Sequence, residues 1–187
     1  CVTRRQRQMC IRDRFSKEFS KISPANKIPV IVDNDNNQTV FESGAILLYL
    51  AKKYDKFLNK DKYWEIIQWV FFQMAYVGPM LGQAHQYLFY HPGKSKFAED
   101  KTKGYAQHIY SILDKRLSKQ EYFSDTYSIA DISIWPWTAR YERHQINLHD
   151  YPNVLRWYKQ ISIRPAVIKG YNSCLLYTSP SPRDLRK

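Results

Sequence analysis

Cysteine is absent from residues 15–173 of this 187-residue chain, and the three cysteines that it has, Cys1, Cys10 and Cys174, lie near the two ends. A segment without cysteine cannot hold a disulfide framework or a thiolate-bound metal ion, and it offers no thiol nucleophile of its own. If residues 15–173 take part in thiol chemistry, the thiol must therefore come from a bound ligand.

Long apolar runs and metal-binding motifs are missing as well. No run approaches the roughly 18 apolar residues that a membrane-spanning helix needs, and no secretory signal is visible. We therefore expect a cytoplasmic protein that has no membrane partner. None of the five histidines stands four residues from another, so the sequence predicts no metal site. There is also no G-x-G-x-x-G motif and no P-loop.

The two ends of the chain share an unusual relationship. Residues 4–14 (RRQRQMCIRDR) and 174–184 (CLLYTSPSPRD) can be encoded by inverted copies of one DNA element, which is typical of a translated transposon-end sequencing adapter. We therefore expect residues 1–14 and 173–187 to be non-native flanks. Eight of the 29 basic and two of the 17 acidic residues lie there, so the net charge falls from +12 to about +6. Such a mildly basic domain gives no reason to expect a nucleic-acid partner.

The segment from Asn26 to Gly44 (NKIPVIVDNDNNQTVFESG) has the clearest local pattern. An apolar run, a polar turn and a second short apolar run predict a β-hairpin, and the E-S-G sequence leads into an apolar helix. Ser43 at this strand-to-helix junction can cap the helix. Alternatively, its hydroxyl and the free amides of the first turn can bind a carboxylate. With Glu42 beside it to hold a cation, the pair suits the α-amino-acid end of a small ligand.

The remainder of the chain reads as helices, and we expect a helical domain over residues 58–172. Gly78 and Pro79 predict a break or kink in the first long helix. Ser128 and Asp131 are spaced as a capping box, in which each side chain bonds the backbone amide at the other position. We interpret this box as a folding signal and give it no chemical role.

These motifs together resemble the glutathione transferase family. The I-P-V strand, the hairpin and E-S-G-A-I-L-x-Y-L-A are similar to the second half of its glutathione-binding domain. The resemblance implies an α+β fold, with a truncated thioredoxin-like domain over residues 15–57 and an all-α C-terminal domain over residues 58–172. The β-α-β unit that family members carry before this point is not found. The catalytic residue is therefore unknown and expected in a missing N-terminal segment, and the chain as given is expected to be inactive.

Two further segments, GPMLGQ at residues 78–83 and YSIADISIWPW at residues 127–137, are most similar to the bacterial nu-class. That resemblance implies a glutathione-dependent disulfide-bond reductase, with glutathione as the co-substrate that supplies the thiols. It also implies two glutathiones or one glutathione disulfide in each site, a small disulfide substrate and a homodimer.

The resemblance also assigns roles to individual residues. Pro29 is expected to be cis, with the backbone of Ile28 beside it pairing with the cysteinyl unit, while Glu42 and Ser43 hold the γ-glutamyl end. Positively charged and polar side chains are expected at the two ends of the paired ligands. These are Lys27 for the glycine carboxylate, Lys101 facing glutathione, and Gln83 with His85 as a second site.

Two alternatives to the disulfide reductase remain open from the sequence. One is a conventional transferase that adds glutathione to an electrophilic substrate, and the other is a non-enzymatic binding module of the same fold. The residue beside the glutathione sulfur would separate the disulfide reductase from the conventional transferase. A lone Tyr or Ser there favours conjugation, and a Thr-x-Asn arrangement favours disulfide reduction. Binding modules often lose the Glu-Ser pair, which this chain keeps at Glu42 and Ser43.

Overall fold

The computed structural model describes residues 15–178, so the expected flanks 1–14 and, in part, 173–187 lie outside the described residues. The chain divides into two compact units. One unit consists of residues 29–158, and the other combines the residues before 29 with those after 158.

The smaller unit holds the helices α2 (Lys17–Ile22) and α9 (Pro165–Thr178). Ser23 follows α2 and is buried. Its hydroxyl donates to the Lys27 carbonyl at 2.8 Å and accepts a hydrogen bond from the Lys27 amide at 3.1 Å. One serine therefore fixes both backbone groups of Lys27 shortly before the first strand begins.

The larger unit begins with the β-hairpin that the sequence predicts. Its strands β1 (Val30–Asp33) and β2 (Gln38–Phe41) pair antiparallel, with Val30 opposite Phe41 and Asp33 opposite Gln38. The polar turn between them matches the Asn- and Asp-rich stretch of the sequence.

A polar cluster ties this hairpin to helix α3 (Ser43–Tyr54). Asp33, at the end of β1, accepts hydrogen bonds from the Tyr49 hydroxyl at 2.6 Å and from Lys53 Nζ at 2.5 Å, and Lys53 also bonds Asp35 at 2.5 Å. Tyr49 and Lys53 are four residues apart on α3 and so share one face of the helix. The hydrogen bond from Lys53, followed by that from Tyr49, lowers the pKa of Asp33 to about 2. The cluster therefore holds the carboxyl end of β1 against α3.

A nearly continuous helical rod covers residues 63–90. It consists of α4 (Tyr63–Phe72), the π-helix η1 (Gln73–Val77), α5 (Gly78–Ala84) and the π-helix η2 (His85–Tyr90). The expected break at Gly78 and Pro79 takes the form of η1, because the Gly78 amide bonds the Gln73 carbonyl five residues back. A wider turn lets the helix continue past a proline that has no N–H to donate.

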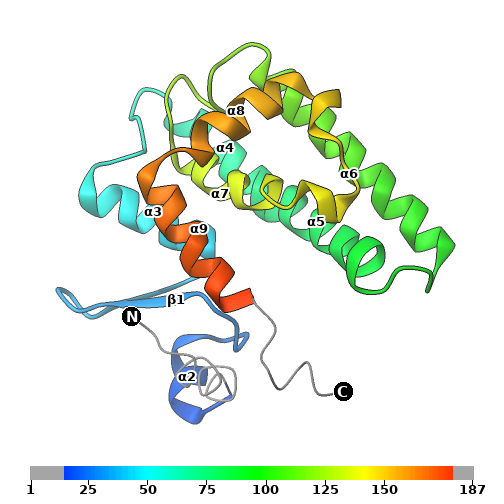
Figure 1. Ribbon diagram of the computed structural model, residues 1–187. Helices are drawn as coiled ribbons and strands as arrows, with labels where there is room; N and C mark the ends of the chain where they lie inside the picture. Colours follow the sequence, from blue (N-terminus) through cyan, green and yellow to red (C-terminus); the bar gives the residue numbers. More distant parts are fainter. Residues whose placement is uncertain (1–14, 179–187) are drawn as a thin grey trace. The chain divides into compact units, whose positions relative to one another are not determined.

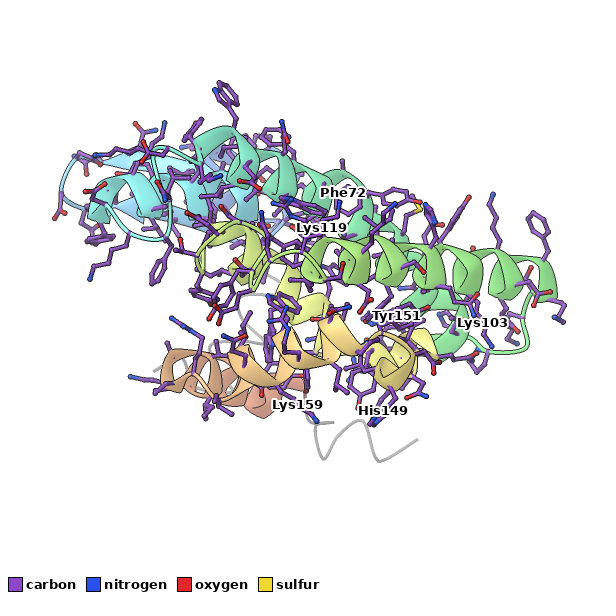
Figure 2. All side chains as sticks on the ribbon, turned by 90° about the horizontal axis from the view of Figure 1, so that it is seen from above. Phe72, Lys103, Lys119, His149, Tyr151 and Lys159 are labelled. Atoms are coloured by element: carbon purple, nitrogen blue, oxygen red, sulfur yellow. The ribbon has the colours of Figure 1, made fainter. Side chains whose placement is uncertain are left out.

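Helix α6 (Lys96–Leu117) lies beside α5, as Figure 1 shows. The chain then forms α7 (Ile129–Thr138), the 3₁₀ turns η3 (Tyr141–His144) and η4 (Leu148–Asp150), and α8 (Pro152–Ser162). Asp114 of α6 accepts hydrogen bonds from the amides of Asn153 and Val154 at 2.8 and 3.1 Å, so its carboxylate caps the start of α8. Tyr151, labelled in Figure 2, donates its hydroxyl to the Gln107 carbonyl of α6 at 3.4 Å.

The predicted capping box at the start of α7 is confirmed. Ser128 Oγ accepts from the Ala130 amide at 3.3 Å, and Asp131 accepts from the Ser128 amide at 3.0 Å. Asp131 is fully buried, and it also accepts from the Phe123 amide at 3.1 Å and from Trp157 Nε1 at 2.8 Å. The box is therefore part of a buried hydrogen-bond centre that joins α7 to the loop before it and to α8.

The core of the larger unit is aliphatic with a few fully buried rings. Its largest buried side chains come from α4, α5, α6, α7, α8 and the loop between α6 and α7. They include Ile66, Leu81, Ile109, Tyr110, Leu113, Phe123, Ile134 and Trp157. None of the helices within residues 15–178 is both long enough and apolar enough to cross a membrane.

Candidate functional site

The junction between β2 and α3 combines a strained residue with an uncapped helix start. Glu42 has φ 67° and ψ 124°, a left-handed conformation that L-residues rarely adopt, and it occupies the N-cap position of α3. Its side chain is exposed and makes no capping hydrogen bond. Strain of this kind costs about 1–3 kcal/mol and is typical of functional sites, because the surrounding structure must enforce it.

Ser43 is the first residue of α3, so its interpretation as a plain helix cap is wrong. Its hydroxyl lies 3.6 Å from Met74 Sδ of η1, and no side chain caps the first turn of α3. The first amides of a helix have no partner within the helix, and the positive end of the helix dipole favours an anion there. We call the first turn of α3, together with the side chains of Glu42 and Ser43, the α3 seat. It offers amides and a hydroxyl for a carboxylate beside an exposed carboxylate for an ammonium group.

Three other predicted site residues lie at or before the start of the hairpin. Lys27 and Ile28 belong to the smaller unit and Pro29 to the larger one. Both backbone groups of Lys27 are engaged by Ser23, while its side chain is exposed. The Ile28 side chain is 71% exposed, which is high for an isoleucine. Their roles toward a ligand stay predictions.

Lys101 and Gln83 are exposed on the helical part of the larger unit. Lys101 Nζ lies 5.6 Å from the ring centroid of Phe97 and 5.8 Å from that of Tyr105, so the ammonium rests between two aromatic rings of its own helix α6. Gln83 lies on α5. Both side chains are accessible to a ligand, and the structure brings neither into contact with the α3 seat.

The proposed second-site residue His85 has a different environment from the one expected. It is only 6% exposed, and its ring stacks on His144 with 4.6 Å between centroids. Burial, followed by the charges of Arg140 and Arg143, lowers the pKa of His85 to about 4. With its lowered pKa, His85 would serve the predicted second site as a neutral hydrogen-bonding group rather than as a cation.

Sequence reasoning missed this stacked histidine pair and the Met74 contact. His85 and His144 are 59 positions apart, and the Tyr110 hydroxyl lies 3.1 Å from His144 Nδ1. Met74 is 31 positions from Ser43. No local sequence pattern reports contacts at such separations, so only the packing of the helices reveals them.

A metal site finds no support in the described part of the chain. Within residues 15–178, no group of three or more His, Cys, Asp or Glu side chains is arranged to hold a metal ion.

Family models match both parts of the chain. The model described as glutathione S-transferase, N-terminal domain, matches residues 9–52, which include the hairpin and the α3 seat. The model described as glutathione S-transferase, C-terminal domain, matches residues 103–160, from α6 to α8.

Individual relatives agree with these matches. The disulfide-bond oxidoreductase YfcG of Escherichia coli (strain K12) is 42% identical over 161 residues, which cover 82% of this chain and 75% of YfcG. A glutathione transferase from Pseudomonas putida, solved with one glutathione disulfide per subunit, has a TM-score of 0.78 and 35% identity. That alignment covers 84% of this chain and 74% of the other. A glutathione transferase from Burkholderia graminis, solved with two glutathione molecules per subunit, has a TM-score of 0.79 and 34% identity, covering 88% and 75%.

Proposed function

Because this chain belongs to the glutathione S-transferase family, we propose that it is a glutathione-dependent disulfide-bond reductase in which glutathione supplies the thiols. The observation that carries the proposal is the α3 seat, where a strained Glu42 and an uncapped helix start suit an amino-acid zwitterion. Residues 15–173 of the 187-residue chain contain no cysteine, so this segment has no thiol of its own to offer.

The relatives support the same reaction class. YfcG is named a disulfide-bond oxidoreductase, and the two solved structures hold either one glutathione disulfide or two glutathione molecules per subunit. A site that accepts both ligands suits a reaction that starts from two glutathiones and ends with their disulfide. We propose that the site of this chain has the same capacity.

The proposed reaction balances with glutathione alone as the reductant. One glutathione thiolate attacks a sulfur of the substrate disulfide, the S–S bond breaks, and a substrate thiolate leaves. The second glutathione thiolate then attacks the glutathione sulfur of the mixed disulfide and releases the other substrate thiolate. Two glutathiones are oxidised to glutathione disulfide, one substrate disulfide is reduced to two thiols, and the two glutathione protons pass to those thiols. The protein's contribution is to position both glutathiones.

The α3 seat is proposed to bind the γ-glutamyl end of the first glutathione. Its carboxylate would accept hydrogen bonds from Ser43 Oγ and the amides of the first turn, and its ammonium would pair with Glu42. The backbone of Ile28 beside Pro29 is proposed to pair with the cysteinyl unit, and Lys27 to contact the glycine carboxylate.

Exposed groups of the helical part are proposed to serve the second glutathione. Lys101 offers a charge and Gln83 an amide, and both side chains are exposed. His85 is buried and has a lowered pKa, so its proposed part in the second site is that of a neutral hydrogen-bonding group.

A homodimer is proposed from one exposed stripe on the helical rod. Trp64, Gln68, Phe71 and Ala75 recur at helical spacing and are all exposed, with Trp64 at 73% and Phe71 at 65%. Large apolar side chains gathered on one exposed face mark an interaction surface, and a second copy of the chain is the simplest partner for it. We further propose that the protein acts in the cytoplasm.

The test is glutathione-dependent reduction of a small model disulfide by the purified chain, compared with conjugation of glutathione to an aryl halide. We expect the chain as given to be inactive. With a family member's N-terminal β-α-β segment joined to it, we expect disulfide turnover that rises steeply with glutathione concentration, slow conjugation, and two glutathiones per subunit at saturation. Fast conjugation with one glutathione per site would instead identify a conventional transferase. Glutathione binding without either reaction would identify a binding module.

A further inference from the structure

Met74 of η1 closes one side of the α3 seat. Its Sδ lies 3.6 Å from the Ser43 hydroxyl, and the side chain packs so tightly on Gly44 that a Cβ there would lie 3.1 Å from Met74 Cγ and 3.3 Å from Sδ. Glycine is therefore the residue that lets Met74 approach the first turn of α3. The contact joins the helix that carries the seat to the π-helical segment of the long rod.

The hydrogen bond from the Ser43 hydroxyl to Met74 Sδ is weak because of its acceptor. A thioether sulfur is a poor hydrogen-bond acceptor, whereas a carboxylate forms bonds about twice as strong as those between neutral groups. In the free protein the Ser43 hydroxyl thus has a partner, because it donates to Met74 Sδ. A carboxylate arriving at the seat can take over that hydroxyl at little cost.

We propose that Met74 is the resting partner of the Ser43 hydroxyl in the α3 seat, a weak acceptor that holds the hydroxyl in the free protein and yields it to the γ-glutamyl carboxylate when glutathione binds. The inference rests on the proposed function and adds to it a residue from the helical part of the chain. The π-helical turn supports the assignment, because such turns are frequent at functional sites.

The test uses two replacements of similar size, Met74→Leu and Met74→Gln, in the full chain. Leucine removes the acceptor, so glutathione affinity should stay within about threefold of the original. Glutamine supplies a stronger neutral acceptor that competes for the hydroxyl, so affinity should fall about fivefold, the cost of one ordinary hydrogen bond. Isothermal titration calorimetry with glutathione measures both, and thermal melting of each variant confirms that it is folded.

Two controls tie the effect to Ser43 and to the γ-glutamyl group. The dipeptide cysteinylglycine lacks that group, so its binding should be equal in the Leu and Gln variants. In a Ser43→Ala background the difference between Met74→Gln and Met74→Leu should vanish, as a double-mutant cycle requires of a direct coupling.

The outcomes separate this inference from the proposed function. If the original chain binds glutathione but the Gln and Leu variants bind it equally, or if their difference persists in the Ser43→Ala background, Met74 is not the resting partner of the Ser43 hydroxyl. If the original chain binds no glutathione at all, the proposed function fails and this inference fails with it.

Discussion

Helices α3 and α7 each start with a serine and an acidic residue within the N-cap and first turn, but side chains cap only the start of α7. At the start of α7, the Ser128 hydroxyl accepts a hydrogen bond from a first-turn amide and the Asp131 carboxylate accepts one from the Ser128 amide. Both residues are buried. At the start of α3, Glu42 is strained, Ser43 contacts only a thioether in its side-chain hydrogen bonding, and no side chain caps the turn. The capped start of α7 serves folding, whereas the start of α3, which no side chain caps, is the one that we propose a ligand occupies.

The largest effect is expected from removing the Asp131 carboxylate at the start of α7, which tests whether that helix start serves folding. Asp131→Ala would leave the amides of Phe123 and Ser128 and the indole of Trp157 buried without their acceptor. We expect the free energy of unfolding to fall by about 3–5 kcal/mol, the usual cost of breaking a buried charged group's contacts. Urea denaturation measures this.

A matched control for that loss is Asp100→Ala, which removes an exposed carboxylate paired with Lys96 one turn away. Exposed pairs of this kind contribute about 0.3–0.5 kcal/mol. Similar losses in the two variants would show that the buried centre around Asp131 does not hold α7 in place.

The same substitution at both serines sharpens the comparison further. Ser128→Ala should cost about 1 kcal/mol of stability, as for a lost helix cap, and leave glutathione affinity unchanged. Ser43→Ala should barely change stability but weaken glutathione binding by about 1.5–3 kcal/mol, the contribution of a hydrogen bond to a charged group. Thermal melting without ligand and calorimetric titration with glutathione measure the two effects. A melting shift for Ser43→Ala with unchanged affinity would make both serines structural.

The smallest expected effect concerns the strained residue. Glu42→Gly should raise stability by about 0.5–1 kcal/mol, because glycine adopts a positive φ without the steric cost that glutamate bears. The same change should weaken glutathione binding, since the proposed partner of the ammonium group is lost. We therefore expect the melting temperature of this variant to rise and its glutathione affinity to fall. Loss of both stability and affinity would contradict the strain argument.

Local features were the ones that the sequence could predict. The hairpin, the start of α3 near Ser43 and the capping box at Ser128 depend on residues within a few positions of each other, and all three are present. The family resemblance is confirmed by the matches to both glutathione S-transferase domain models.

Features that depend on distant contacts could not be predicted. Whether Ser43 caps its helix is decided by the backbone of Glu42 and by Met74 far along the chain. His85 looked like an accessible polar residue beside a helix break, but the helix continues and His144 stacks on the ring. A single sequence does not encode these outcomes in any short pattern, because they arise from how the helices pack.

The π-helical segment η1 also sets the angular phase of everything that follows it in the rod. Each residue of an α-helix advances the chain by about 100° around the axis, and a π-turn accommodates one residue more than an α-turn does. In the present phase Gly78 and Gly82 lie toward Trp137, where added Cβ atoms would come 3.6 and 3.7 Å from its ring. A chain one residue shorter in η1 would rotate α5 by about a quarter turn, carry both glycines away from that ring and place larger side chains against it.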